Sequence, residues 1–141
     1  MLYMLDTDTA SYIIKARGPQ LQAKLSSIEP FMLSISVMTR AELLYGLKRL
    51  PAAHRLHTGV RQFLKIVRAL PWDAEAADFC AEIRHQLAMS GQLIGEMDMM
   101  IAAHSLATAA VLVTNNIRHY ERIQAPLLLE NWWGEGASSQ E

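Results

Sequence analysis

The chain has 141 residues, of which 51% are hydrophobic and 19% charged, and its net charge is −1. This length and balance predict one globular domain with a buried core and exclude a disordered chain. The single cysteine, Cys80, excludes an internal disulfide and a cysteine-based zinc site. No apolar run approaches the ~20 residues of a membrane span and no signal-peptide pattern opens the chain, so we expect a cytoplasmic protein without membrane contact.

The charges are unevenly distributed along the chain. Residues 15–68 hold ten Lys and Arg against two acids, a net charge of +8, and the remainder carries −9. A basic half of this kind suits a polyanion, because neutralising phosphates drives most non-specific affinity for nucleic acids. A solvated helical surface explains the pattern equally well.

The chain opens with an apolar run at residues 2–5 that ends at a polar cluster. The run is too short for a helix and predicts a buried strand. Asp8 or Thr9 then caps a helix, which Gly18 ends before Pro19 begins a short second helix.

A further strand and two helices follow before the middle of the chain. Residues 31–37 predict the strand, and Ser36 or Thr39 caps the helix after it. Pro51 begins a longer basic helix with apolar residues at helical spacing. Residues 70–72 predict a short third strand.

Helices and strands also alternate in the second half. Asp73 and Gly91 supply the start and the end of an amphipathic helix. Three β-branched residues in five make 110–114 the clearest buried strand. The predicted elements here are helices at 73–91 and 95–109, a strand at 110–114, a helical turn at 118–123 and a strand at 127–129.

Apolar strands that alternate with helices predict an α/β fold, with a parallel sheet covered by helices on both faces. We expect one domain over residues 1–133 and a flexible tail over 134–141. Ligands of such sheets bind beyond the carboxyl ends of the strands. The residues at those positions are Asp6, Ser36 and Asn116.

Two acids in the first half are candidates for chemistry. Asp6 ends an apolar strand, where a carboxylate is costly unless it meets a cation or several donors. Because Asp8 and Thr9 stand closer to the helix start, we expect capping to fall on them and Asp6 to serve a site. Glu42 follows Thr39 at the spacing of a capping box, yet it lies among apolar residues of a basic segment, so a cap and a functional role both stay open.

Asp98 lies in the first turn of an otherwise apolar helix, where the helix dipole stabilises an anion. It shares a helix face with Ile94, Ile101 and Ala102, which we expect to be buried. A buried acid without a base nearby in sequence needs a partner from elsewhere, and a metal ion would serve. A simple helix N-terminal acid is the alternative.

Carboxylates from three separate segments favour a hard cation such as Mg²⁺ or Mn²⁺. The five histidines show no zinc-hydrolase spacing. The glycine-rich signatures of dinucleotide binding, the P-loop and the nucleophile elbow are also absent. The commoner nucleotide-binding and esterase classes are therefore excluded.

Four sequence blocks stand in a recognisable order and spacing: MLDTD at 4–8, ISVMTRAELLYG at 35–46, DMMIAAHSLA at 98–107 and VTNNIRHYERI at 113–123. Together they resemble the PIN-domain ribonucleases, and more closely the VapC-type toxins of bacterial toxin–antitoxin pairs. The resemblance implies a three-layer α/β/α sandwich with a five-stranded parallel sheet. It also implies RNA cleavage dependent on Mg²⁺ or Mn²⁺, a cognate antitoxin protein and a homodimer.

The resemblance assigns the catalytic and metal-binding acids to Asp6, Glu42 and Asp98. Many relatives place a fourth acid where this chain has Asn115 and Asn116. Asn116 is therefore a candidate for holding a water molecule or a phosphate, and the pattern provides for one metal ion more readily than for two.

Four further candidates rest on position alone. Asp8 matches a family position often held by Asn or Ser and is a possible extra ligand, although capping explains it as well. Ser36 ends a strand. Arg49 and Arg55, from the basic segment, are candidates for contacts with the RNA backbone.

Two other functions remain open at this point. Asp6 to Thr9 resembles the DxDxT nucleophile motif of haloacid-dehalogenase-like phosphatases, but that family needs a downstream lysine and none follows Lys65. The chain could also be a non-catalytic binding module whose acids only cap helices. The presence of all three acids in their family contexts argues against this module.

Overall fold

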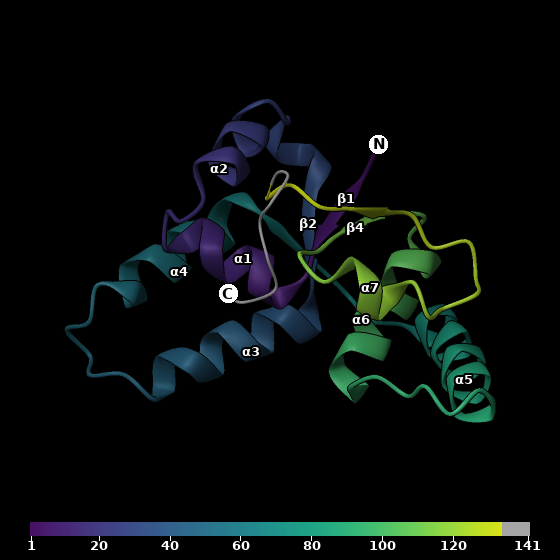
Figure 1. Ribbon diagram of the computed structural model, residues 1–141. Coiled ribbons are helices and arrows are strands. Elements are labelled where there is room, and N and C mark those ends of the chain that lie inside the picture. The colour runs from purple at the N-terminus through teal and green to yellow at the C-terminus, as the bar shows by residue number, and fades with distance from the viewer. Residues whose placement is uncertain (134–141) are drawn as a thin grey trace.

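The computed structural model describes residues 1–133, in which helices cover a five-stranded sheet (Figure 1). All neighbouring strands are parallel, and their order is β3-β2-β1-β4-β5. The strands are β1 Tyr3–Leu5, β2 Leu33–Ser36, β3 Arg68–Leu70, β4 Val111–Val113 and β5 Leu129–Glu130. The predicted α/β class and the parallel sheet are confirmed.

Seven α-helices and one short 3₁₀ helix connect these strands within residues 1–133. They are α1 Thr7–Ile14, α2 Pro19–Ser26, the 3₁₀ helix Pro30–Met32, α3 Val37–Lys48, α4 Leu56–Ile66, α5 Ala74–Met89, α6 Glu96–Ala107 and α7 Ile117–Tyr120. No helix among the described residues is long and apolar enough to cross a membrane. The tail expected at 134–141 lies outside the described residues.

Two separate hydrophobic clusters show that the sheet is the middle of three layers. Helices α1 to α4 pack on the face that presents Leu5, Ile35 and Val113. The cluster around α5, α6 and α7 includes Leu112, the neighbour of Val113 in β4. Since successive strand residues point to opposite faces, these two residues assign the clusters to opposite sides of the sheet. The expected three-layer sandwich is confirmed.

Several element boundaries differ from the prediction, among them those of the last strand, which is Leu129–Glu130 and not 127–129, and of the preceding helical turn, which is Ile117–Tyr120 and not 118–123. The edge strand β3 ends at Leu70 instead of Trp72, because Pro71 has no N–H to continue the ladder. Helix α4 begins at Leu56, five residues after Pro51. Before β2, residues 30–32 form the 3₁₀ helix that the apolar pattern did not separate from the strand.

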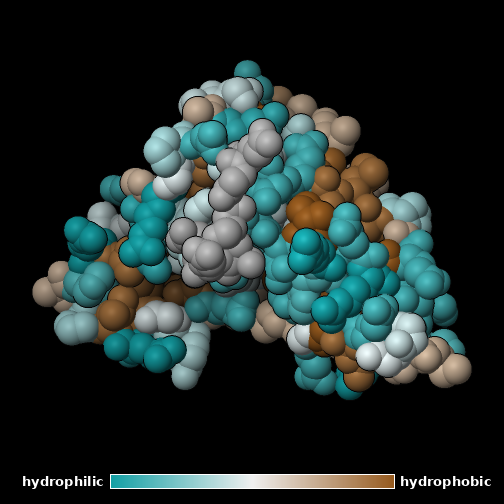
Figure 2. Space-filling model, in the orientation of Figure 1, coloured by the Kyte–Doolittle hydropathy of each residue, from teal (hydrophilic) through white to brown (hydrophobic). Residues whose placement is uncertain are grey.

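The strand order reverses at β1, and this point opens a crevice at the carboxyl ends of the strands. From β1 the chain crosses to β2 on one side, whereas β4 pairs with β1 on the other. In doubly wound sheets the ligand site lies at such a switch point. The space-filling view shows the surface hollowed at its lower edge, between the part built from α1 to α4 and the part built from α5 to α7 (Figure 2).

Candidate active site

Asp6 stands at the switch point, directly after β1. Its backbone N–H donates to the Val113 carbonyl at 3.0 Å, which ties the turn to the end of β4. Its carboxylate accepts the Thr9 N–H at 2.9 Å and caps α1. The expectation that Asp8 or Thr9 caps this helix is therefore wrong, because the chain is already extended at Asp6 and helical from Thr7 onward.

Burial controls the protonation of Asp6. The residue is 7% exposed, and this desolvation raises the pKa of its carboxyl to about 6. Hydrogen bonds from Thr114 and Thr9 oppose the rise, whereas the negative charge of Asp8 adds to it. A carboxylate placed like this gains from a cation beside it.

Asp98 lies in the first turn of α6 and is held by α7. Its Oδ1 accepts the Tyr120 hydroxyl at 3.2 Å, and its Oδ2 lies 3.1 Å from His119 Nε2. Its side chain is 42% exposed, so the expectation of a buried acid is wrong. Ile101 is buried as predicted, but the helix start itself is exposed at Glu96.

Tyr120 bonds to Asp98 and senses the charge of Asp6. Its side chain is buried at 2% exposure. Burial, followed by the negative charges of Asp6 and Asp98, raises the pKa of its hydroxyl. Tyr120 therefore keeps its proton and donates it. Because Asp98 accepts this hydroxyl and Asp6 acts on it electrostatically, the turn after β1 and the first turn of α6 lie near each other.

Glu42 is half-buried in the second turn of α3. Ser36 caps this helix by accepting the Met38 N–H at 3.1 Å, so Glu42 is not part of a capping box and that interpretation is wrong. Its Oε1 instead accepts the Thr7 hydroxyl from α1. Glu42 thus faces the turn that carries Asp6, 35 residues away in sequence from Thr7.

A cleft of about 420 Å³ runs between α1, α3 and α4 from this point. Asp8 and Glu42 line its acidic part, and Lys15 and Arg49 line its basic part. Its floor is apolar, with contributions from Leu43, Leu47, Leu50 and Val60. Arg49 therefore shares a surface with Glu42 and Asp8, whereas Asp6 and Asp98 are not part of this lining.

The other sequence candidates lie farther from the acids or are differently engaged. Ser36 is fully buried, and its hydroxyl lies 2.8 Å from His104 Nδ1 while it caps α3. Asn116 is exposed at the start of α7, with its N–H donated to Thr114 at 2.9 Å. Arg55 is exposed before α4 and makes no side-chain cap there.

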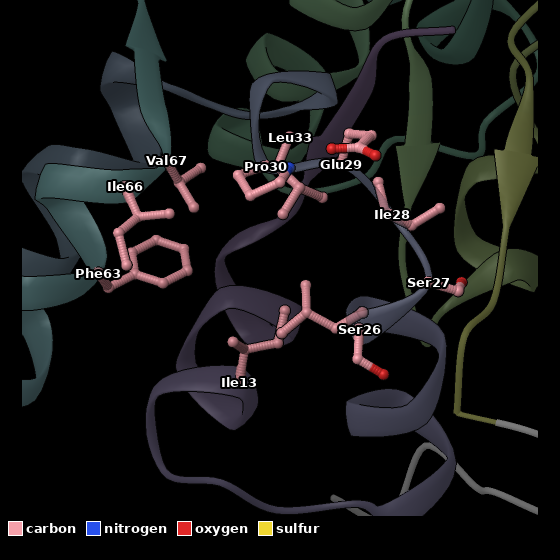
Figure 3. A pocket seen from close by; sticks show the side chains of 11 residues that line it. Ile13, Ser26, Ser27, Ile28, Glu29, Pro30, Leu33, Phe63, Ile66 and Val67 are labelled. Carbon is pink, nitrogen blue, oxygen red and sulfur yellow. The ribbon is translucent and has the colours of Figure 1, made fainter.

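A second hollow, of about 430 Å³, lies elsewhere on the same side of the sheet. Figure 3 shows Ile13, Phe63, Ile66 and Val67 among its lining side chains. Glu29 is the one acid in this lining. The hollow thus contains none of the candidate site acids and has no group of side chains suited to hydrolysis.

The donor set at the strand ends fits a hard cation. Within residues 1–133, no group of three or more His, Cys, Asp or Glu is arranged so that it could hold a metal ion by itself. Magnesium, however, commonly uses one or two protein carboxylates and completes its shell with water and substrate phosphates. The buried Asp6 carboxyl and the Asp98 carboxyl, both close enough to act electrostatically on Tyr120, are oxygen donors of this type.

Sequence reasoning missed the partners of these acids. Thr7, His119 and Tyr120 all contact a candidate acid. The sequence indicated these residues only by placing them in the four blocks that carry the family resemblance. Contacts between residues 21 to 35 positions apart leave no periodic pattern in a single sequence.

Comparisons with known proteins identify the family of this chain. The PIN domain family model matches residues 3–125. The chain is 34% identical over 130 residues to the tRNA(fMet)-specific endonuclease VapC of Salmonella typhimurium, with 92% of this chain and 97% of the relative covered. It is 35% identical to ribonuclease VapC2 of Haemophilus influenzae, with the same coverage.

Solved structures extend the match to the whole fold. VapBC2 from Rickettsia felis, bound to a promoter DNA fragment, superposes with a TM-score of 0.85 at 32% identity and covers 94% of this chain and 99% of that one. A phosphatase of haloacid-dehalogenase type and a non-catalytic module are thereby excluded. The chain belongs to the PIN-domain family and, within it, to the VapC-type ribonucleases.

Proposed function

We propose that this ribonuclease cleaves internal phosphodiester bonds of RNA at the carboxyl ends of β1 and β4, with Asp6, Asp98 and Glu42 as its catalytic acids. The buried Asp6 is the observation that carries the proposal. Its carboxyl lies at the switch point of the sheet with a raised pKa and with other acids beside it. A cation and a phosphate group together would satisfy such a site.

PIN-domain nucleases generally depend on divalent metal ions. We propose Mg²⁺ as the ion of this chain, with Mn²⁺ as a substitute, because all candidate ligands are hard oxygen donors. When bound, such an ion acts as a Lewis acid toward the scissile phosphate and lowers the pKa of water. Asp6 and Asp98 would hold it.

The remaining side chains have supporting roles in this proposal. Glu42 completes the ligand set or accepts the proton of the attacking water. Asp8 and Asn116 are exposed nearby and are the candidates for further contacts with water or phosphate. Ser36 is proposed to support the site only through α3, because its hydroxyl is already engaged with Met38 and His104.

Purified protein is expected to cleave RNA with Mg²⁺ or Mn²⁺ and to stop in excess EDTA, because a site made of carboxylates has no electrophile without its cation. Gel electrophoresis of a labelled RNA measures the products. Adding Mg²⁺ back should restore cleavage, and Zn²⁺ should be unnecessary. Unchanged cleavage in excess chelator would refute the metal dependence.

Tyr120→Phe should weaken metal binding while the protein stays folded. The change removes the donor to Asp98 Oδ1, and loss of a hydrogen bond to a ligating carboxylate costs about 10–100-fold in metal affinity or activity. Titration calorimetry with Mn²⁺ measures the affinity. Tyr45→Phe, on the exposed side of α3, is the matched control and should bind Mn²⁺ like the parent protein.

Arg49→Ala and Arg55→Ala should reduce RNA binding through the phosphate backbone. Each lost contact should reduce the slope of log affinity against log salt concentration by roughly 0.7–0.9, and it should weaken the binding of all RNAs about equally. Binding is measured across a salt series on the Asp6→Asn background. Arg84→Ala, which lies in α5 on the other face of the sheet, should leave the slope unchanged. An unchanged slope in the first two variants would mean that RNA approaches from elsewhere.

The relatives also indicate a substrate and partners to test. One curated relative is named as specific for tRNA(fMet), so initiator tRNA is the first structured RNA to assay. The solved Rickettsia felis and Salmonella typhimurium structures are VapBC assemblies on DNA. We propose that this chain likewise acts as a toxin, that a cognate antitoxin inhibits it, and that it forms a homodimer.

A further inference from the structure

Two threonine hydroxyls lie between Glu42 and the turn that carries Asp6. The Thr7 hydroxyl donates to Glu42 Oε1 and lies 3.1 Å from the Thr39 hydroxyl. Thr7 is the first residue of α1, whereas Thr39 and Glu42 belong to α3. The caps of these helices are Asp6 and Ser36, so helix capping explains none of the three side chains.

The hydrogen bonds of this group run in one direction. A threonine hydroxyl has one proton to donate, and an ionised carboxylate can only accept. Since Thr7 gives its proton to Glu42, the Thr39 hydroxyl must donate to Thr7. Thr39 is fully buried, where an unpaired hydroxyl would be destabilising, so this bond faces little competition from water.

This arrangement restricts the Glu42 carboxylate. Thr39 and Glu42 are three residues apart and therefore share one face of α3, the face toward α1. Thr7 follows Asp6 directly, so the bond to Oε1 fixes that oxygen relative to the end of β1. The second oxygen, Oε2, is left for a ligand or a water molecule in the cleft that Glu42 lines with Thr7 and Asp8.

We infer that Thr39 and Thr7 are positioning residues, a relay of two hydroxyls that holds the Glu42 carboxylate in its working orientation. The inference rests on the role proposed above for Glu42. Neither threonine touches the reacting atoms, and both act through Glu42. Hydrogen-bonded partners of this kind orient ligating carboxylates in metal sites.

Valine and serine variants separate the hydroxyl from the shape of the side chain. Thr7→Val and Thr39→Val should each lower Mn²⁺ affinity and kcat by about 10-fold or more, since loss of an outer hydrogen-bond partner has that effect. The KM for RNA should stay nearly unchanged, because RNA binding does not need the relay. Thr7→Ser and Thr39→Ser keep the hydroxyl and should restore most of both values.

A second cycle tests whether the effect passes through Glu42. On a Glu42→Gln background, Thr7→Val should cause no further loss of Mn²⁺ affinity, because residues that act through one another are not additive. Titration calorimetry on metal-free protein measures this without any cleavage assay. Thr108→Val is the matched control: its hydroxyl bonds to the His104 carbonyl at the end of α6, and its loss should not change Mn²⁺ affinity.

The outcomes distinguish the relay from the proposed function. If Glu42→Gln binds Mn²⁺ and cleaves RNA like the parent protein, the proposed role of Glu42 fails and the relay fails with it. If Glu42→Gln is defective but Thr7→Val is not, the relay alone is overturned. The relay is also overturned if Thr7→Val is defective and Thr7→Ser is equally defective. It is overturned as well if Thr7→Val lowers Mn²⁺ affinity further on the Glu42→Gln background. Should the buried Thr39→Val fail to fold, the half-buried Thr7 pair decides.

Discussion

Replacing Asp6 by asparagine should abolish RNA cleavage while the protein stays folded. Asparagine can still cap α1 by accepting the Thr9 N–H, but it cannot supply the negative charge that holds a cation. Removal of one charge-stabilising group at an active site commonly costs at least about 10²-fold in rate, and we expect no less here. Single-turnover cleavage of a labelled RNA measures the loss.

The same substitution should stabilise the metal-free protein, and the gain should depend on pH. Burial raises the pKa of Asp6 from 3.8 to about 6, so the folded state binds this proton more tightly than the unfolded state does. The free energy of unfolding therefore falls as pH rises from about 4 to about 7. The expected fall is about 3 kcal/mol, because each unit of pKa difference between the folded and unfolded states corresponds to about 1.36 kcal/mol. Asp6→Asn has no such dependence.

Urea denaturation at several pH values, without metal, measures this difference. Saturating Mg²⁺ should reduce it, because a bound cation favours the charged carboxylate. Asp8→Asn, an exposed change two residues away, is the control and should show little of the effect. Asp98→Asn should also abolish cleavage, but it should stabilise the apo protein less than Asp6→Asn, since its side chain is half-exposed. A stability of Asp6→Asn below that of the parent at pH 7 would contradict the account.

Replacing Glu42 by glutamine should cause a similarly large loss of cleavage. Glutamine has nearly the same shape, and it can still accept the Thr7 hydroxyl. It is a much weaker metal ligand and cannot accept a proton at neutral pH. Because Ser36 and not Glu42 caps α3, the free energy of unfolding should change little.

Glu29→Gln is the matched control for this experiment. Glu29 is the other acid of the basic segment, and it is exposed just before the 3₁₀ helix, away from the strand ends. It should cleave RNA at the parent rate. Near-normal activity of Glu42→Gln would show instead that Glu42 has a structural role through Thr7.

The central strands and the positions of the three acids could be predicted because they depend on local signals. Buried parallel strands are continuous apolar runs, and an acid at the end of one is conspicuous. The edge strand β3 was less predictable, because its first residue, Arg68, is exposed. Pro71 and Trp72, which follow the strand, made the apolar run look as if it continued past Leu70. Two interpretations also overlapped at Asp6, which caps α1 and is at the same time the proposed site acid after β1.

The environment of each acid could not be predicted from a single sequence. The burial of Asp6 depends on its neighbours in the folded chain, which include Thr114 from the end of β4. The donors to Asp98 come from α7, and the donor to Glu42 comes from α1. Such tertiary contacts decide whether an acid is a cap, a ligand or a proton acceptor, and sequence spacing alone left Glu42 open between these roles.

The metal site at Asp6 and Asp98 is tested most directly by a crystal structure of the protein soaked in Mn²⁺, with the anomalous signal of the ion recorded. We expect one strong peak at the carboxyl ends of β1 and β4, at metal–oxygen bonding distance from the carboxylates of Asp6 and Asp98. Mn²⁺ should be absent from this place in Asp6→Asn crystals. A peak ligated by other residues, or an unchanged peak in the variant, would contradict it.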